Sequence, residues 1–582
     1  MYANNQHTET LMHYHPGSVE APVLSGGALR ALTAIIEGPV PGRTLARSML
    51  RRLGVEDFRT RRFEETPRFQ PLVPGNRPET DQPASPWREE KYPAALGVVE
   101  DSTKGGPLPT VLDYYRAYRE GGATPREVAG TIAATIREDS FEGAPLHAFI
   151  AWDEEDVLRQ AEDSSLRIAR GQARSVLEGV PVAIKDELDA AGFPTTVGTA
   201  FIRDPIKDRD AFVVQRLRDA GAIILGKTNM HEIGIGVTGL NPFYGTPLNP
   251  CDPGRYPGGS SSGSGMVVGA GLCPLALGAD GGGSVRVPAA FCGVLGLKMT
   301  WGRVSTAGEY PLGYTVGNNG PIAASARDLA LAYVITAGAD PNDPSTASGP
   351  PPTLEGFLED LEGVRIGVYT PWFEDCRREI AEAGRAMLER LSAAGARVLE
   401  IEIPGLEELR IAHMITITLE MGASMDAYLR SGAKAFGLET RMNLALARHL
   451  TTSDYIKAQQ VRARMMDRLG EVFRRVDVIA TPTTANFPPL LRGKRLQSGV
   501  SDLRNTLETI RFTAPANMTG NPALSVPAGF VNVPGGKYPV PVGLQCIGRH
   551  WEEPLLLRIA RVAEESLERP RPPVYLAPLR KS

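Results

Sequence analysis

The sequence is short of cysteine and has no excess of charge of either sign. Its five cysteines are scattered, odd in number and never spaced as a CxxC pair. This spacing argues against a disulfide framework and for reduced thiols in a cytoplasmic setting. Lysine and arginine together number 63, and aspartate and glutamate 67. Because no net field is present to attract nucleic acid, we expect no nucleic-acid partner.

We also expect neither a targeting segment nor a membrane span from the sequence. Positions 1–15 contain no basic stretch followed by an apolar run, so we expect no secretory signal. The one long uncharged stretch, residues 256–279, is too rich in glycine and serine for a membrane span. The chain has 582 residues, 42% of them hydrophobic. It can therefore bury a large core, and it far exceeds the roughly 100–200 residues of a typical domain.

The character of the sequence changes near residue 110. Residues 1–110 contain two short helical patterns, at 27–36 and 43–54, and then a charged, proline-rich passage at 68–93. Proline, glycine and charge without periodicity are typical of irregular segments. We therefore expect residues 1–110 to form a helical and irregular N-terminal extension.

Residues 111–582 are expected to form one α/β domain. Helical patterns alternate there with short apolar strand patterns, which favours a sheet covered by helices. Around 345–471 the sequence is mostly helical, so we expect an insertion into one continuous sheet. The strand patterns lie at 180–184, 222–225, 364–370, 397–403, 477–484 and 541–548, and the clearest helical patterns at 153–171, 211–221 and 378–395.

Glycine and serine are concentrated in residues 257–293, where ten glycines fall between Gly258 and Gly283. Because glycine permits positive φ, a Gly-Gly-Gly-Ser turn can direct successive N–H groups at one point. The amides of Gly281, Gly282, Gly283 and Ser284 are therefore candidate oxyanion donors, each worth about 3–4 kcal/mol. The alternatives are a flexible linker, which the apolar flanks disfavour, and a phosphate loop, which lacks its usual Gly-Lys-Ser/Thr here.

A serine nucleophile needs a base, and histidine is the usual one. GSSSG at 259–263 fits the loose G-x-S-x-G elbow pattern, but His413, His449 and His550 stand in no recognisable catalytic context. Lys185 is the better candidate because it ends the apolar run GVPVAI. Burial disfavours the charged form of lysine, and a neutral amine can accept a proton. The alternative is a solvated lysine, or one paired with either of the two acidic residues that follow it.

Several segments of the sequence resemble the amidase signature family. GVPVAIKD (179–186), PGGSSSGSG (257–265) and ADGGGSVRVPAAFCG (279–293) match the stretches that hold the family's lysine, bridging serine and nucleophilic serine. NMHEIGIGVTGLNPFYGT (229–246) is similar to the plant-type fatty acid amide hydrolase branch. The resemblance extends over almost the whole chain, including the N-terminal helices and the proline-rich passage.

This resemblance implies a Ser-cisSer-Lys triad. It assigns the nucleophile to Ser284, the bridging serine to Ser260 and the base to Lys185, and the separations of these positions along the chain agree with the family. It also implies that the peptide bond preceding Ser260 is cis. The sequence departs from the family at Ala279, where threonine is frequent, and at Ser262, where many members have glycine. Neither departure touches the triad.

The resemblance further implies a fold and supporting residues. The amidase-signature fold is an α/β fold whose central mixed β-sheet is covered by helices on both faces, here with an N-terminal helical extension. We expect Asp280 and Arg286 to hold the nucleophile turn by hydrogen bonds, with Ser261 as a further support. A surface ion pair is the alternative for Asp280 and Arg286. No metal and no cofactor is expected.

The activity implied is that of a serine amidohydrolase, which cleaves carbon–nitrogen amide bonds through an acyl-enzyme. Fatty acid amides such as N-acylethanolamines, or related N-acyl amides, are the expected substrates. Short-chain or aryl amides are an alternative, as is the role of ammonia-generating subunit of a tRNA-dependent amidotransferase. A non-catalytic binding protein is disfavoured because the lysine and both serines of the triad are present.

Residues 25–54 combine apolar and basic side chains at helical spacing. The resemblance implies that these helices lie on a lipid surface or cap an apolar tunnel, and the alternative is packing on the protein's own core or on a dimer partner. From the resemblance we expect a homodimer, cytoplasmic and in peripheral contact with a membrane. The apolar positions are Leu29, Leu32, Ile35, Ile36, Leu45, Met49, Leu50 and Leu53, and the basic ones Arg43, Arg47, Arg51 and Arg52.

Overall fold

The computed structural model describes residue 14 and residues 21–75, 106–202, 205–491, 493 and 498–579. Most of positions 1–15, in which no secretory signal is expected, lie outside the described residues, as does the proline-rich passage from residue 76 on. Among the described helices, none is both long enough and apolar enough to cross a membrane.

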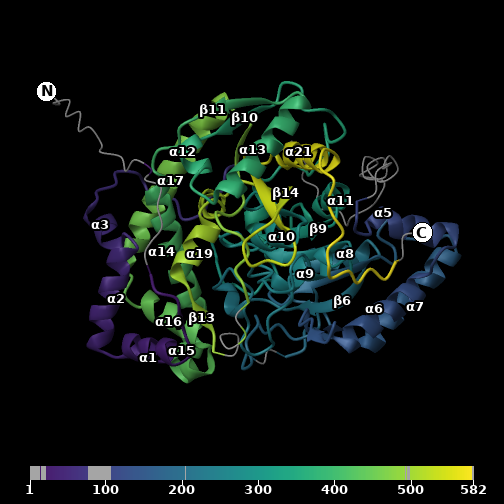
Figure 1. The fold of residues 1–582 in the computed structure, drawn as a ribbon, viewed down its shortest axis with the longest axis horizontal. Coiled ribbons are helices and arrows are strands. Elements are labelled where there is room, and N and C mark those ends of the chain that lie inside the picture. Colours follow the sequence, from purple (N-terminus) through teal and green to yellow (C-terminus); the bar gives the residue numbers. More distant parts are fainter. Residues whose placement is uncertain are drawn as a thin grey trace.

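One mixed sheet of eleven strands forms the centre of the molecule (Figure 1). Its strands are β4 (Phe149–Trp152), β5 (Pro181–Lys185), β6 (Ile223–Thr228), β7 (Leu275–Ala279), β8 (Leu295–Lys298), β9 (Asn319–Ala323), β10 (Arg365–Val368), β11 (Arg397–Glu400), β12 (Val478–Pro482), β14 (Ala523–Val531) and β15 (Val540–Gly548). They lie in the order β11-β10-β12-β15-β14-β8-β9-β7-β5-β6-β4. The pairs of β5 with β6 and β7, and of β10 with β11 and β12, are parallel, and the other pairs are antiparallel.

Helices cover this sheet. The glycine-rich α9 (Ser262–Gly269) and α10 (Arg286–Cys292) pack on β5, β7, β8 and β14, whereas α11 (Ala326–Thr336), α13 (Arg378–Ala393) and α21 (Glu553–Glu565) form a second group on β8, β9, β14 and β15. The remaining helices along the sheet are α5 (Val111–Glu120), α6 (Pro125–Glu138), α7 (Glu154–Ala169), α8 (Phe212–Asp219), α12 (Thr370–Phe373) and α20 (Ala514–Thr519).

The predicted α/β fold, a mixed sheet between helices, is confirmed. The strand patterns at 180–184 and 541–548 correspond to β5 and β15, and the helical pattern at 378–395 to α13. All five residues of β5 are buried, because a strand with neighbours on both edges and helices over it has no solvent-facing side. The short pairs β1 (Leu24–Ser25) with β13 (Val500–Ser501) and β2 (Ser140–Phe141) with β3 (Ala144–Pro145) lie outside the main sheet.

The chain between β11 and β12 is helical and stands beside the sheet. It forms α14 (Leu406–Ser424), α15 (Asp426–Gly432), α16 (Leu438–Ala447) and α17 (Thr452–Arg475), and α19 (Leu503–Ile510) lies near them. β10 and β11, which lie within the predicted insertion around 345–471, pair within the main sheet. The division into an extension, a domain and an insertion stays a prediction.

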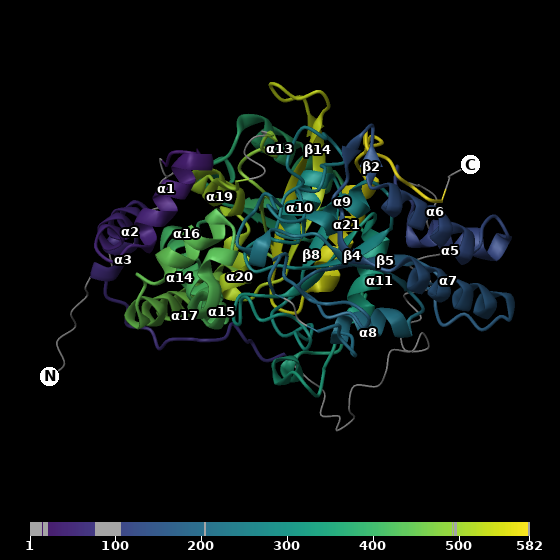
Figure 2. The same ribbon diagram turned by 90° about the horizontal axis from the view of Figure 1, so that it is seen from below.

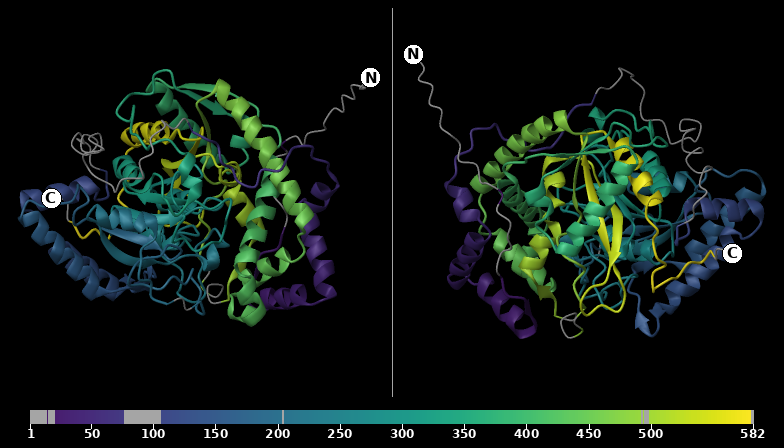
Figure 3. Two further views of the ribbon diagram at one scale, coloured as in Figure 1. Left: turned by 180° about the vertical axis from the view of Figure 1, so that it is seen from behind. Right: turned by 45° about the horizontal axis from the view of Figure 1, so that its top comes forward.

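The N-terminal helices α1 (Gly26–Glu37), α2 (Pro41–Arg52) and α3 (Val55–Thr60) pack on the outside of α14 and α16. Figures 2 and 3 show them beside these helices in three further views. Leu29, Leu50 and Leu53 are buried in the same core cluster as Ile411 and Ile415 of α14. The apolar positions of residues 25–54 therefore face the protein's own core in large part.

Candidate active site

Lys185 is the last residue of β5, and its side chain is only 1% exposed. Its Nζ donates hydrogen bonds to Ser260 Oγ at 2.8 Å and to the carbonyl of Ala279 at 3.1 Å. Oε2 of Glu187 lies 2.6 Å from the same Nζ, within ion-pair distance. Lys185 thus makes the contact that a triad requires, and it also has an acidic partner two positions further along the chain.

Ser260 and Ser261 lie at the start of α9, beneath the end of β7. The Gly259–Ser260 peptide bond is cis, as the resemblance implies. Ser261 donates its amide to the carbonyl of Ser284 at 3.3 Å and its hydroxyl to the carbonyl of Ala279 at 3.4 Å. Ser261 therefore links the segment of the bridging serine to the turn that carries Ser284.

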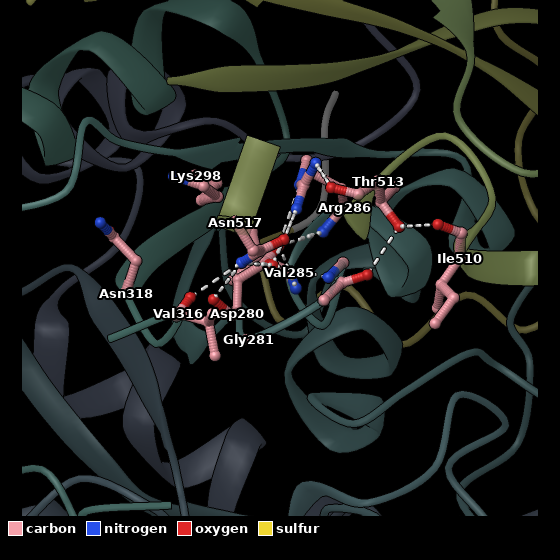
Figure 4. Close-up of polar contacts among 12 residues, drawn as sticks. Asp280, Gly281, Val285, Arg286, Lys298, Val316, Asn318, Ile510, Thr513 and Asn517 are labelled. Atoms are coloured by element: carbon pink, nitrogen blue, oxygen red, sulfur yellow. Dashed lines mark hydrogen bonds and ion pairs between the residues drawn. The ribbon is translucent and has the colours of Figure 1, made fainter. Parts of the chain in front are cut away.

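The turn after β7 is built around Asp280. This carboxylate accepts hydrogen bonds from the amides of Gly283 (2.6 Å) and Val285 (3.1 Å) and pairs with the guanidinium of Arg286 at 2.9 Å (Figure 4). Burial disfavours the carboxylate, but Arg286 and Asn517 hold the pKa of Asp280 well below its usual range. Both members of the pair are fully buried, so a surface ion pair is the wrong interpretation.

The carbonyls of the turn are held by two side chains from distant elements. His413 of α14 donates from Nε2 to the carbonyl of Gly281 at 2.8 Å, and Thr513 donates its hydroxyl to the carbonyl of Gly282 at 2.6 Å. Burial lowers the pKa of His413 to about 4, so the ring is neutral and this nitrogen carries the proton. The sequence alone indicates no role for His413, because its partner lies 132 residues away along the chain.

The backbone amides of the Gly281–Ser284 turn fall into two groups. The Gly283 amide donates to Asp280, so it is already engaged within the turn. The amides of Gly281, Gly282 and Ser284 make no hydrogen bond to the residues that the structure describes. Of the four donors predicted from sequence, these three remain open to a ligand.

Ser284 is partly exposed and lines a cavity together with Gly259, Gly282 and Gly283. Its hydroxyl makes no hydrogen bond within the described part of the chain, including to Ser260. The structure thus brings Lys185 and Ser260 into direct contact and leaves the hydroxyl of Ser284 open to the cavity. The hydrogen bond between a nucleophile and its proton acceptor is often long without substrate and shortens when substrate binds.

The cavity above Ser284 is mainly apolar, and its far side comes from helices α2, α14, α16 and α19. We call this surface the cavity wall. Its α2 members are among the amphipathic positions for which a cap over an apolar tunnel is one interpretation of the sequence, but the sequence does not identify the other wall residues. The main apolar members of the cavity wall are Met49, Leu50, Leu53, Met414, Ile417, Met421, Met442, Leu446, Leu503, Leu507 and Ile510.

Comparison with known proteins gives one consistent family. A family model described as Amidase matches residues 141–557. A fatty acid amide hydrolase of Medicago truncatula is 38% identical over 96% of this chain and 95% of its own length. One subunit of the glutamyl-tRNA(Gln) amidotransferase of Koribacter versatilis is 33% identical over 78% of this chain and 97% of its own. Among solved structures, the crystal structure of an amidase has a TM-score of 0.68 at 31% identity and covers 79% of this chain and 100% of its own.

Proposed function

The chain belongs to the amidase family and is an amide-cleaving hydrolase, and from that premise we propose that Ser284 is its nucleophile, activated by Lys185 through Ser260. The observation that carries this proposal is the buried 2.8 Å contact between Lys185 Nζ and Ser260 Oγ beside a cavity lined by Ser284. A serine hydroxyl is a weak nucleophile, so it needs a neighbouring base of this kind.

The proposed reaction moves one proton in each direction. Ser284 Oγ attacks the amide carbonyl and gives its proton to Ser260, which passes its own proton to the neutral amine of Lys185. When the tetrahedral intermediate breaks down, the proton returns through Ser260 to the leaving nitrogen, because an unprotonated amine is a poor leaving group. Water then hydrolyses the acyl-enzyme.

We assign the oxyanion donors to the amides of Gly281, Gly282 and Ser284. Their carbonyls are held on the other side of the turn, by His413 and Thr513 for the two glycines and by the Ser261 amide for Ser284. Such fixed donors stabilise the charge that develops on the carbonyl oxygen without reorganising during the reaction. Asp280 and Arg286 keep the turn in this arrangement.

The substrate we propose is a fatty acid amide or a related N-acyl amide. An apolar cavity lined by the proposed nucleophile suits a hydrocarbon chain, because burial is worth about 0.8 kcal/mol per methylene. The matched relatives of plant origin are themselves named for fatty acid amides. The wall contributed by α2 lies outside the region that the family model matches, so the N-terminal extension helps to define the substrate.

Two measurements test this proposal. A serine-directed fluorophosphonate should label the wild type and leave Ser284→Ala unlabelled, whereas Ser262→Ala, a matched change in the same glycine-rich segment, should label normally. A panel of amides and esters graded by acyl length should show kcat/KM rising with chain length. Labelling of Ser284→Ala would refute the nucleophile, and a preference for short or aryl amides would refute the lipid substrate.

We also propose peripheral membrane contact through residues 25–54. The side chains of Arg43, Arg47, Arg51 and Arg52 are exposed on α2, and Val40 beside them is 74% exposed. Basic and apolar groups on one exposed helix favour an anionic lipid surface. Sedimentation with anionic but not neutral vesicles is expected, and analytical ultracentrifugation will test the homodimer that the resemblance implies.

A further inference from the structure

A carboxylate that the proposed proton relay does not use lies against its base. Glu187 Oε2 is 2.6 Å from Lys185 Nζ, and the two side chains are 7% and 1% exposed. Glu187 follows the end of β5, and its carbonyl accepts a hydrogen bond from the amide of Tyr310 at 2.8 Å. This contact fixes the backbone of Glu187 against the segment around Tyr310.

A second carboxyl group, that of Glu309, stands behind the first. Glu309 pairs through its backbone with Leu188 in an isolated antiparallel bridge, which brings it next to Glu187. Its Oε2 is shielded from solvent and has no hydrogen-bond partner among the described residues. Burial, and then the charge of Glu187, hold the pKa of Glu309 well above its usual range. The neutral form of the Glu309 carboxyl is therefore favoured, whereas the carboxyl group of Glu187 lies within ion-pair distance of Lys185 Nζ.

The other charged groups around Lys185 have partners of their own. From β6, Lys227 pairs with Asp186 at 3.0 Å, and at the end of β7 Asp280 pairs with Arg286. Asp343, whose charge also acts on Glu309, accepts hydrogen bonds from neighbouring threonine and serine groups. Among the described residues, Glu187 is the one carboxylate within ion-pair distance of Nζ.

We propose that Glu187 is a positioning residue that acts through Lys185, as the counter-ion of the ammonium formed during acylation. This inference rests on the proposed function of Ser284, Ser260 and Lys185. In acylation the Ser260 proton moves to the Nζ lone pair, and one positive charge appears there while one negative charge appears on the carbonyl oxygen. Glu187 neutralises the new positive charge inside the protein and holds the amine in line with Ser260.

The test is the pH profile of kcat/KM for amide hydrolysis. Its acid limb reports protonation of the base in the free enzyme. An opposite charge within about 4–6 Å favours a charged group by about one to three pH units, so Glu187→Gln is expected to move the acid limb to lower pH by that amount. Glu187→Asp keeps the negative charge but places it further from Nζ. The acid limb of this variant should therefore also move to lower pH, by less than that of Glu187→Gln.

Glu309→Gln is the matched control, because it replaces a neutral carboxyl by a neutral amide of the same shape. Its acid limb is expected to coincide with that of the wild type. The inference is overturned if both Glu187 variants keep the wild-type limb, or if Glu309→Gln moves the limb as far as Glu187→Gln does. If Glu187→Gln does not fold, as judged by thermal unfolding, Glu187→Asp alone decides.

Lys185→Ala, measured in parallel, separates failure of this inference from failure of the proposed function. If the Lys185→Ala variant hydrolyses amides at the wild-type rate, the proposed relay is refuted, and the counter-ion role of Glu187 is refuted with it. If Lys185→Ala is inactive and the acid limb of the Glu187 variants does not move, only the counter-ion role of Glu187 is refuted.

Discussion

The triad region and the cavity wall meet at Ser284, yet they are built on different principles. The triad region, which holds the proposed triad and comprises Lys185, Ser260 and residues 280–286, lies between residues 185 and 286 and is held by specific hydrogen bonds between buried polar groups. The cavity wall is assembled from α2, α14, α16 and α19, which are scattered from residue 41 to residue 510, and it consists mostly of interchangeable apolar side chains.

This difference explains why the sequence indicates the reaction type more clearly than the substrate. A buried polar group must find a partner of fixed type and geometry, so few residues satisfy each position of the triad region. An apolar wall tolerates any side chain of suitable size. The chemistry is therefore specified by recognisable residues at recognisable spacings, whereas the choice of substrate depends on the shape that several helices enclose together.

The largest expected effect lies in the triad region. Lys185→Ala should lower kcat/KM for amide hydrolysis by at least about 10³-fold, because the relay loses both its general base and its general acid. Ser262→Ala provides the control, since the hydroxyl of this buried serine in α9 donates only to the carbonyl of Asn229. Near-normal hydrolysis by Lys185→Ala would mean that the specific hydrogen bonds of this region do not serve catalysis.

The next largest effect is on stability and concerns Asp280. Asp280→Ala leaves the buried guanidinium of Arg286 without its carboxylate, and breaking a buried pair in this way costs about 3–5 kcal/mol. Urea unfolding should show the loss. Arg378→Ala, which removes an ion pair whose arginine is 88% exposed, should cost less than about 1 kcal/mol. Equal losses in the two variants would contradict the account of the turn.

The sequence supports predictions that depend on neighbouring residues and fails where distant elements meet. β5 and the Gly281–Ser284 turn could be anticipated because an apolar run and a glycine cluster are local properties. His413, Thr513 and Asn517 could not, because they reach the turn from 132 to 237 residues away along the chain. Glu187 was visible beside Lys185, but only the fold decides which of two successive acids faces the amine.

A change in the cavity wall should alter substrate preference and leave the chemistry intact. Met442 of α16 lines the cavity, and Met442→Trp should reduce kcat/KM for long-chain amides by about 10-fold, the scale at which hydrophobic pockets discriminate by size. Short-chain amides should be hydrolysed as before. Leu399→Trp, on the edge strand β11, is the control. A uniform loss over all chain lengths would place Met442 in the support of the triad region instead.

The last effect concerns the pH dependence of stability and lies where the two regions join, at His413. Burial lowers its pKa from 6.5 to about 4. The His413 ring is therefore protonated below pH 6.5 in the unfolded chain but only below about pH 4 in the folded protein. Stability from this group is therefore lost as pH falls through that window, at up to about 1.4 kcal/mol per pH unit. His413→Gln retains a donor for the carbonyl of Gly281 and cannot titrate, so its unfolding free energy should fall less steeply between pH 6.5 and 4. Parallel curves for the two proteins would show that His413 is protonated in the folded state, and that the carbonyl of Gly281 is held by a charged ring.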